Sequence, residues 1–266
     1  MLKLSVSELS TFRWSFEEDV LHYQQAGFQA IGVWRAKIAE YGEEKGVELL
    51  HEHGMAVSSL QWIGGFTGSD GRTFSESMQD GFDGLELAAQ LKAYSVVVLA
   101  GGRSGHTKNH ALRLLKHALK ELSEAAQSIG VQLALEPMHI GCAHDFTFLT
   151  ELPQTLDLIA ELGLPNLGLV FDCYHLAQDP RVLAWLPDIL PFVRLVQIGD
   201  AKHAPMGEQN RCLLGQGHLP LSQIMNLLND HKYDGFLEVE LLGEEIENVD
   251  YATVLQSSKV WVDDRA

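Results

Sequence analysis

Cysteine is scarce in this sequence, with three residues in 266, and none of them belongs to a CxxC pair. Cys142, Cys173 and Cys212 leave one thiol unpaired under any disulfide scheme, so we expect reduced thiols. Long apolar runs are also missing: neither the opening MLKLSVSELS nor any later stretch has the length of a signal peptide or a membrane span. The sequence therefore predicts a cytoplasmic protein without a membrane partner.

Positive charge is the second shortage. Lys and Arg number 19 against 36 Asp and Glu, which gives a formal charge of −17. Such an acidic field repels a phosphate backbone, so nucleic acid is not an expected partner. No low-complexity linker interrupts the chain, and its composition does not change sharply along its length. With 46% hydrophobic residues, the sequence predicts one domain over residues 1–266.

Short apolar runs alternate with longer amphipathic stretches from end to end, which is typical of a parallel α/β fold. Eight runs are predicted strands: Leu2–Ser5, Phe28–Val33, Ala56–Leu60, Ser95–Leu99, Val131–Glu136, Leu167–Asp172, Val193–Ile198 and Phe236–Leu241. Glycines that cap a helix in the left-handed conformation are predicted just before several strands, at Gly27, Gly54, Gly130, Gly163 and Gly235. The pattern favours a closed (β/α)8 TIM barrel, with a doubly wound open sheet as the alternative.

Polar residues at the carboxyl ends of strands mark the active site of such a barrel. The second half of the chain has them repeatedly, at Glu136, Asp172, Gln197, Asp200, Glu238 and Glu240. Side chains alternate along a strand, so Gln197 and Asp200 face opposite ways, and Gln197 is the better interior candidate. Glu238 and Glu240 share one face about 7 Å apart. Only one of them can reach a common ion, and we choose Glu240.

A lone carboxylate at a strand end most often caps the next helix or pairs with a surface lysine. Together, these residues would bury several charges, which a divalent cation neutralises. If Gln197 turns its amide oxygen to the ion, all donors of the site are oxygens, and such sites favour Mn²⁺ or Mg²⁺ over zinc. Alternatively, Gln197 does not touch the ion and only hydrogen-bonds a carboxylate.

The same segments resemble the motif series of the xylose isomerase-like barrels. The likeness is carried by LALEPMH, VFDCYH, VQIGD, NRCLLGQG and GFLEVE, together with LSVSELSTF and AIGVWR near the start. That group includes sugar and sugar-phosphate isomerases and epimerases, hydroxypyruvate isomerase, inosose dehydratase and endonuclease IV. The resemblance covers nearly the whole chain, and its motifs are more specific to the superfamily than to a substrate.

The resemblance implies one divalent metal held by Glu136, Asp172, position 197 and Glu240. Position 197 is His in the epimerase branch and Gln here, as in the hydroxypyruvate isomerase and inosose dehydratase branches. Mn²⁺ or Mg²⁺ is the expected ion, with Co²⁺ or Zn²⁺ as alternatives. Family likeness also suggests a homodimer or a homotetramer.

Catalytic and substrate-binding roles come from the same resemblance. Glu136 and Glu240 are the expected acid–base pair, and His175 is expected to polarise the reacting oxygen, although a helix-capping histidine is the alternative. Arg211 resembles the family's substrate-anchoring arginine, or is a solvated loop residue.

Three further residues are predicted to contact substrate from their places after strands. Arg35 and Trp62 follow the second and third predicted strands, where they would form the rim and the apolar wall of a sugar pocket or pack under loops. Arg103 lies in GGRSGH, a loop whose backbone N–H groups can cradle a carboxylate or a phosphate, or which is simply a turn.

The function expected from these features is metal-dependent isomerisation or epimerisation of a small sugar, sugar phosphate or hydroxy-keto compound through a metal-stabilised enediolate. An inosose dehydratase-like lyase is the first alternative, because the same enediolate can expel water. A non-catalytic sugar-binding barrel is another. An enzyme like endonuclease IV is disfavoured, since it needs a three-zinc cluster and several histidines that QWIGG and VQIGD do not supply.

Overall fold

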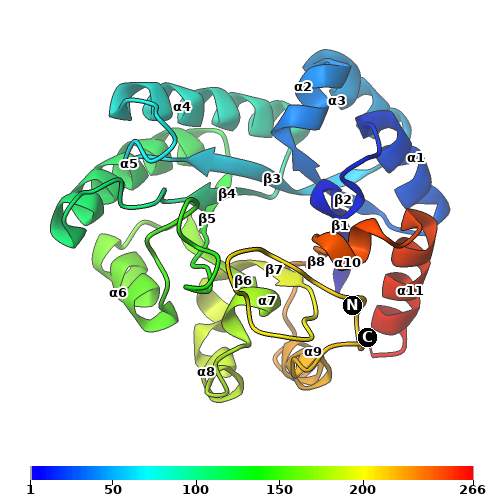
Figure 1. Ribbon diagram of the computed structural model, residues 1–266. Helices are drawn as coiled ribbons and strands as arrows, with labels where there is room; N and C mark the ends of the chain where they lie inside the picture. The colour runs from blue at the N-terminus through cyan, green and yellow to red at the C-terminus, as the bar shows by residue number, and fades with distance from the viewer. Residues whose placement is uncertain (1, 266) are drawn as a thin grey trace.

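Eight parallel strands close into a barrel in chain order, and helices surround it (Figure 1). The computed structural model describes residues 2–265. The strands are β1 (Lys3–Ser7), β2 (Ala30–Trp34), β3 (Ala56–Gly64), β4 (Ser95–Leu99), β5 (Gln132–Leu135), β6 (Leu167–Asp172), β7 (Val193–Ile198) and β8 (Phe236–Val239). The predicted (β/α)8 barrel is therefore confirmed, and the open-sheet alternative is wrong because β1 pairs with β8.

The helices follow the strands in alternation. They are η1 (Glu8–Thr11), α1 (Phe16–Gln25), α2 (Arg35–Tyr41), α3 (Glu43–Glu52), α4 (Phe74–Leu91), α5 (Lys108–Ser128), α6 (Leu152–Leu162), α7 (Cys173–Leu176), α8 (Val182–Ile189), η2 (Leu190–Phe192), α9 (Leu221–Asp230), α10 (Glu244–Glu247) and α11 (Tyr251–Asp263). Reciprocal capping boxes start α1, at Ser15 and Glu18, and α4, at Thr73 and Glu76. Within residues 2–265, no helix combines the length and the apolar character that a membrane span requires.

Five of the eight strands have bounds that differ from the predicted ones: β5 is shorter at both ends, β8 is shorter at its C-terminal end, and β1, β2 and β3 differ for reasons visible in the hydrogen bonding. β1 continues to Ser7 because it pairs with β2 up to Gly32, and β3 continues to Gly64 because it pairs with β4. The second strand starts at Ala30 instead of Phe28, whose N–H closes the end of α1 by donating to the Tyr23 carbonyl. Apolar character alone does not distinguish a strand residue from one that packs beneath a helix end.

Four of the five predicted cap glycines have the expected left-handed backbone, at Gly27, Gly54, Gly130 and Gly163. The prediction for Gly235 is wrong. The left-handed residue after α9 is Lys232, with φ 53°. A Cβ on Gly235 would lie 2.3 Å from the Tyr233 hydroxyl, so this glycine makes room for the tyrosine ring.

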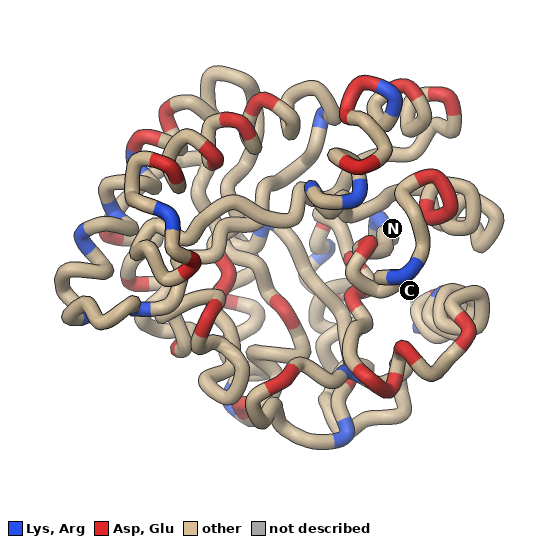
Figure 2. Tube along the Cα trace, turned by 45° about the horizontal axis from the view of Figure 1, so that its top comes forward, with Lys and Arg blue, Asp and Glu red and all other residues tan. Residues whose placement is uncertain are grey.

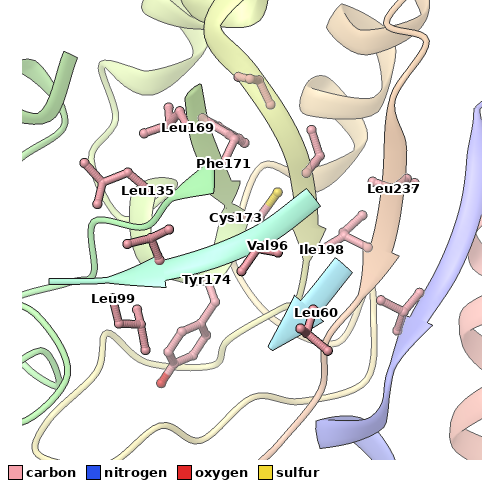
Figure 3. Close-up of a cluster of buried hydrophobic side chains, with 14 of the residues drawn as sticks. Leu60, Val96, Leu99, Leu135, Leu169, Phe171, Cys173, Tyr174, Ile198 and Leu237 are labelled. Carbon is pink, nitrogen blue, oxygen red and sulfur yellow. The ribbon is translucent and has the colours of Figure 1, made fainter. Parts of the chain in front are cut away.

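Apolar side chains form two separate clusters. The larger one lies between the barrel and the helices and includes Leu60, Phe171, Cys173 and Leu237, which come from different parts of the chain (Figure 3). The smaller one fills the lower barrel interior with Ala30, Val97, Ala134, Val170, Leu195 and Phe236. All three cysteines are free, as the expected reduced thiols would be, and all three are buried. Above the small cluster the barrel interior is polar, and this is where the site lies.

Acidic positions are spread over the molecule, whereas basic positions are fewer (Figure 2). One buried polar cluster lies at the ends of β1 and β2. Lys37 Nζ contacts Asp19 Oδ2 at 2.5 Å and donates to the Thr11 carbonyl at 2.8 Å, while Thr11 donates to Asp19 Oδ1 at 2.6 Å. Burial raises the pKa of Glu8 well above its usual value and that of Asp19 to about 6, although Lys37 lowers both.

Candidate active site

Four oxygen-bearing side chains from consecutive strands are buried at the barrel mouth. Glu136 follows β5 and is 6% exposed, Asp172 ends β6 at 0%, Gln197 lies on β7 at 1%, and Glu240 follows β8 at 5%. The backbone of Glu136 still donates to the Val98 carbonyl, and that of Glu240 donates to the Ile198 carbonyl. These bonds extend the sheet by one residue at both strands and fix where the two carboxylates begin.

Arg211 connects two of these carboxylates. Its Nη2 atom donates to Asp172 Oδ2 at 2.7 Å and to Glu240 Oε1 at 3.1 Å, and the side chain is fully buried. The guanidinium stacks over the Tyr174 ring, 4.2 Å from its centroid. Burial tends to lower the pKa of Arg211, but Asp172 and Glu240 raise it overall. Arg211 is therefore a fixed positive charge in the site.

Gln197 lies between Glu238 of β8 and Glu240, which follows that strand. Its Nε2 atom donates to Glu240 Oε2 at 2.7 Å and to Glu238 Oε1 at 3.3 Å. Its Oε1 atom is buried without a hydrogen-bond partner. Glu238 and Glu240 both point inward, as the alternation of side chains requires, but at different depths. Glu238 has its own set of hydrogen-bond donors, which include Ser58 and Ser59.

His175 reaches the same cluster from α7. Its Nε2 atom lies 3.5 Å from Asp172 Oδ2 and 3.9 Å from Glu136 Oε1 and has no hydrogen-bond partner. Its Nδ1 atom lies 3.6 Å from the Cys142 sulfur. Burial lowers the pKa of His175 to about 4, although Asp172 opposes that shift. Burial also raises the pKa of the Cys142 thiol to about 11.

Negative charge exceeds positive charge in this cluster. Glu136, Asp172, Glu238 and Glu240 face a single guanidinium. Burial raises the pKa of Glu136 well above its usual value, and the neighbouring Glu240 and Asp172 raise it further. Burial likewise raises the pKa of Glu240 to about 8, against the opposing effect of Arg211. The protein alone does not compensate this buried negative charge.

The donors present fit a divalent cation. Ligand atoms of Glu136, Asp172 and His175 lie within 4.8 Å of one another. Three buried polar atoms of this cluster, His175 Nε2, Gln197 Oε1 and Arg211 Nε, have no hydrogen-bond partner. Buried polar atoms are almost always paired in folded proteins. Of the three, the Gln197 amide oxygen can only accept, so next to surplus carboxylates it points to a missing cationic partner.

Of the other predicted substrate contacts, Arg35 and Arg103 lie apart from this cluster, whereas Trp62 lies over the barrel interior. Arg35 starts α2 and pairs with Asp80 of α4 at 3.0 Å, so its guanidinium faces the outer helical layer. Arg103 is exposed and lines a pocket of about 650 Å³ at the rim. Trp62 does lie over the barrel interior, where it packs against the small apolar cluster and against Phe146, with ring centroids 6.4 Å apart.

Asp200, the residue that strand parity set aside, has a structural role. β7 ends at Ile198, and the Asp200 carboxylate accepts hydrogen bonds from the backbone N–H groups of Ala201, Gly215, Gly217 and Leu219. These bonds fold the loop that carries Arg211. The sequence contains a signal for this role, since the two glycines of GQG mark a turn in the loop after the strand.

A family model described as a xylose isomerase-like TIM barrel matches residues 21–262. The chain belongs to this family. Among curated members, an inosose isomerase of Halalkalibacterium halodurans is 24% identical over 272 residues, which cover 97% of this chain and 94% of the relative. A fructoselysine 3-epimerase of Escherichia coli O157:H7 is 27% identical over 160 residues, which cover 59% of this chain and 56% of that enzyme.

Solved structures agree on the fold of the family. A protein from Sinorhizobium meliloti 1021 superposes with a TM-score of 0.90 at 24% identity, covering 99% of this chain and 98% of the other. An IolI protein with a bound zinc atom gives a TM-score of 0.85 at 21% identity, covering 99% and 97%. At these identities the likeness shows the shared barrel alone.

Proposed function

We propose that this protein is a divalent-metal-dependent isomerase or epimerase of a small polyhydroxy carbonyl compound. The observation that carries the proposal is the pair of inward carboxylates, Glu136 and Glu240, on either side of Asp172 in a mouth where negative charge is in excess. The names of the curated relatives, an inosose isomerase and a fructoselysine 3-epimerase, support this class of reaction.

Glu136, Asp172, Gln197 and Glu240 would hold the cation. When bound, it supplies Lewis-acid polarisation of the substrate carbonyl. Three carboxylates and an amide oxygen are hard donors, so Mn²⁺ or Mg²⁺ suits the set better than Co²⁺ or Zn²⁺. The unpartnered Oε1 of Gln197 supports its place among the donors.

Glu136 and Glu240 act as the acid–base pair. They project from β5 and β8 across the mouth, so a substrate lying between them presents opposite sides to the two carboxylates. One glutamate removes the proton from the carbon beside the carbonyl, and the other returns a proton to that carbon or to its neighbour. Return to the same carbon from the other side gives epimerisation. Return to the neighbouring carbon, the former carbonyl carbon, gives isomerisation, with the hydroxyl proton passing to the former carbonyl oxygen.

His175 donates a hydrogen bond to the substrate oxygen instead of binding the cation. The imidazole is neutral, and the proposed role requires its hydrogen on Nε2, the atom that faces Asp172 and Glu136. His175 Nδ1 would then accept from the Cys142 thiol at 3.6 Å, in place of the bond that the thiol donates to the His139 carbonyl at 3.5 Å. Arg211 keeps Asp172 and Glu240 oriented, and Trp62 forms the apolar wall for a sugar ring.

Proton exchange at carbon tests the proposal directly. The protein is incubated in D₂O with Mn²⁺ or Mg²⁺ and a panel of ketoses, ketose phosphates and inososes, and ¹H NMR follows the carbon beside the carbonyl. We expect deuterium uptake together with interconversion for at least one substrate. If no compound in the panel shows deuterium uptake or interconversion, the proposed function is wrong for those compounds. In the inosose arm, absorbance of a conjugated dione would identify a dehydratase instead.

A further inference from the structure

Glu238 is a fully buried carboxylate that the proposed reaction does not use. From β3 it accepts hydrogen bonds from Ser58 Oγ at 2.6 Å, Ser59 Oγ at 2.7 Å and Gln61 Nε2 at 2.9 Å. From β7 it accepts a fourth from Gln197 Nε2 at 3.3 Å. All four donors are neutral groups. Burial raises the pKa of Glu238, and these bonds oppose the rise.

Strand β2, which is separated from β8 by β1 alone, leaves room for this carboxylate. A Cβ on Gly32 of β2 would lie 2.5 Å from Glu238 Oε2 and 2.7 Å from its Cδ, so any larger residue would displace the carboxyl group. With hydrogen bonds on both oxygens, Glu238 has little capacity left for a cation. The barrel therefore holds this glutamate for a purpose other than ligation.

Among residues 2–265, the Gln197 amide is the one donor that joins Glu238 to the cluster above it. Only an NH₂ group can face two carboxylates, so the contacts with Glu238 Oε1 and Glu240 Oε2 decide which end of the amide points where. The amide oxygen is left buried and without a partner. Because the NH₂ group is held by the carboxylates of Glu238 and Glu240, the amide oxygen points away from both of them.

We propose that Glu238 is a positioning residue that orients the Gln197 amide, so that its oxygen faces the cation. This inference rests on the proposed function, since it takes the cation site as given. A cation that draws the oxygens of Glu240 toward itself weakens the Glu240–Gln197 bond. Glu238, held by Ser58, Ser59 and Gln61, then remains the acceptor that keeps the amide from turning over. Partners behind a ligand commonly set its orientation in this way.

A double-mutant cycle on Mn²⁺ affinity tests the role, with free Mn²⁺ measured by its EPR signal. Glu238→Asp keeps the charge and withdraws the carboxylate from Gln197, whereas Glu238→Gln removes the charge at nearly constant size. Each is made in the wild-type chain and in Gln197→Met, which lacks the amide. Circular dichroism and thermal unfolding confirm that each variant is folded, and Glu238→Asp carries the test if Glu238→Gln does not fold.

We expect each Glu238 substitution to weaken Mn²⁺ binding about 10- to 100-fold in the wild-type chain. In the Gln197→Met background the same substitutions should change the affinity by no more than about twofold, because the bond they break is already absent. Equal losses of affinity in both backgrounds would overturn the inference. They would mean that Glu238 affects Mn²⁺ binding through its charge or through the fold, and not through Gln197. Unchanged affinity in the wild-type chain would overturn it as well. If the wild-type chain itself binds no Mn²⁺, the proposed function fails, and the inference fails with it.

Discussion

The two halves of the barrel mouth are built from different chemistry. Strands β5 to β8 each end near an oxygen-bearing side chain of the cluster, at Glu136, Asp172, Gln197 and Glu240. Strands β1 to β3 turn neutral groups inward, and Gly32, Ser58 and Ser59 there surround a glutamate of the other half. One half provides the charged groups, and the other provides space and neutral donors that hold one of them.

Charge balance also separates the halves. The ionic cluster of the first half brings Glu8 and Asp19 together with Lys37, next to the hydroxyls of Thr11 and Tyr23. It lies where η1, α1 and α2 pack together, and its two carboxyl groups share the one ammonium, with Glu8 Oε1 left without a hydrogen-bond partner. In the second half four carboxylates share one guanidinium, and three polar atoms, His175 Nε2, Gln197 Oε1 and Arg211 Nε, are unpaired. The excess of carboxylates is thus larger in the second half, and the larger uncompensated excess indicates a missing ligand.

The largest effect should come from neutralising the acid–base pair. Glu136→Gln and Glu240→Gln should each lower kcat by about 10²- to 10⁴-fold, since each removes a group that transfers a proton. Steady-state rates on the substrate identified by deuterium uptake give the measurement. Asp19→Asn is the matched control, because it removes a buried carboxylate from the first half and should leave kcat per folded molecule nearly unchanged. Equal losses in all three variants would contradict the division of roles.

The layer between barrel and helices should not share this asymmetry. Leu60 on β3 and Leu237 on β8 both pack in the larger apolar cluster (Figure 3). Leu60→Ala and Leu237→Ala should therefore each lower the free energy of unfolding by about 2–5 kcal/mol through lost burial and a cavity. Urea unfolding measures both. A cost below about 1 kcal/mol in only one of them would show that one half dominates the stability.

Metal preference distinguishes ligation by Gln197 from a purely supporting role. Gln197→His places an imidazole nitrogen in the site, so the preference should shift from Mn²⁺ toward Zn²⁺ or Co²⁺. Competition binding of Mn²⁺ against Zn²⁺ to the wild type and the variant gives the ratio. If Gln197 lies behind the ligands, the substitution weakens every metal alike, and an unchanged ratio would count against ligation.

The smallest expected effect is a pH dependence of stability in the first half. The pKa of Asp19 is raised to about 6 by burial, so the folded state retains a proton that the unfolded state has lost. The stability from this group is present below about pH 4 and is lost as the pH rises through 6. Compared with Asp19→Asn, the wild type should lose free energy of unfolding over that interval. Urea titrations at pH 4, 5 and 7 measure it, and a flat difference would contradict the shift.

Side-chain alternation was enough to predict which of these polar side chains point into the barrel. It placed Gln197 inward and set Asp200 aside, whereas Glu240 was preferred to Glu238 for the mouth because it is the more C-terminal of two residues on one face. Alternation cannot specify partners across the barrel, because Ser58 and Glu238 lie on strands that are not neighbours in the sheet. The role of Glu238 was therefore not visible in the sequence.

Residues at strand-to-helix junctions were also beyond sequence reasoning. Arg35 follows β2 directly, but it is already the first residue of α2, and the helical turn directs it to Asp80. Gly235 follows a helix, but the chain reverses three residues earlier, at Lys232. Both cases depend on the backbone angles of one or two residues, which apolar periodicity does not encode.

A crystal structure of the protein with Mn²⁺, located by anomalous scattering, tests the central claim most directly. The account predicts one ion per chain, bound by Glu136, Asp172, Gln197 and Glu240, with the Gln197 oxygen turned to the metal. It would be contradicted by an ion bound only elsewhere, such as beside Glu8 and Asp19, or by no ion in the mouth at a concentration that saturates binding in solution.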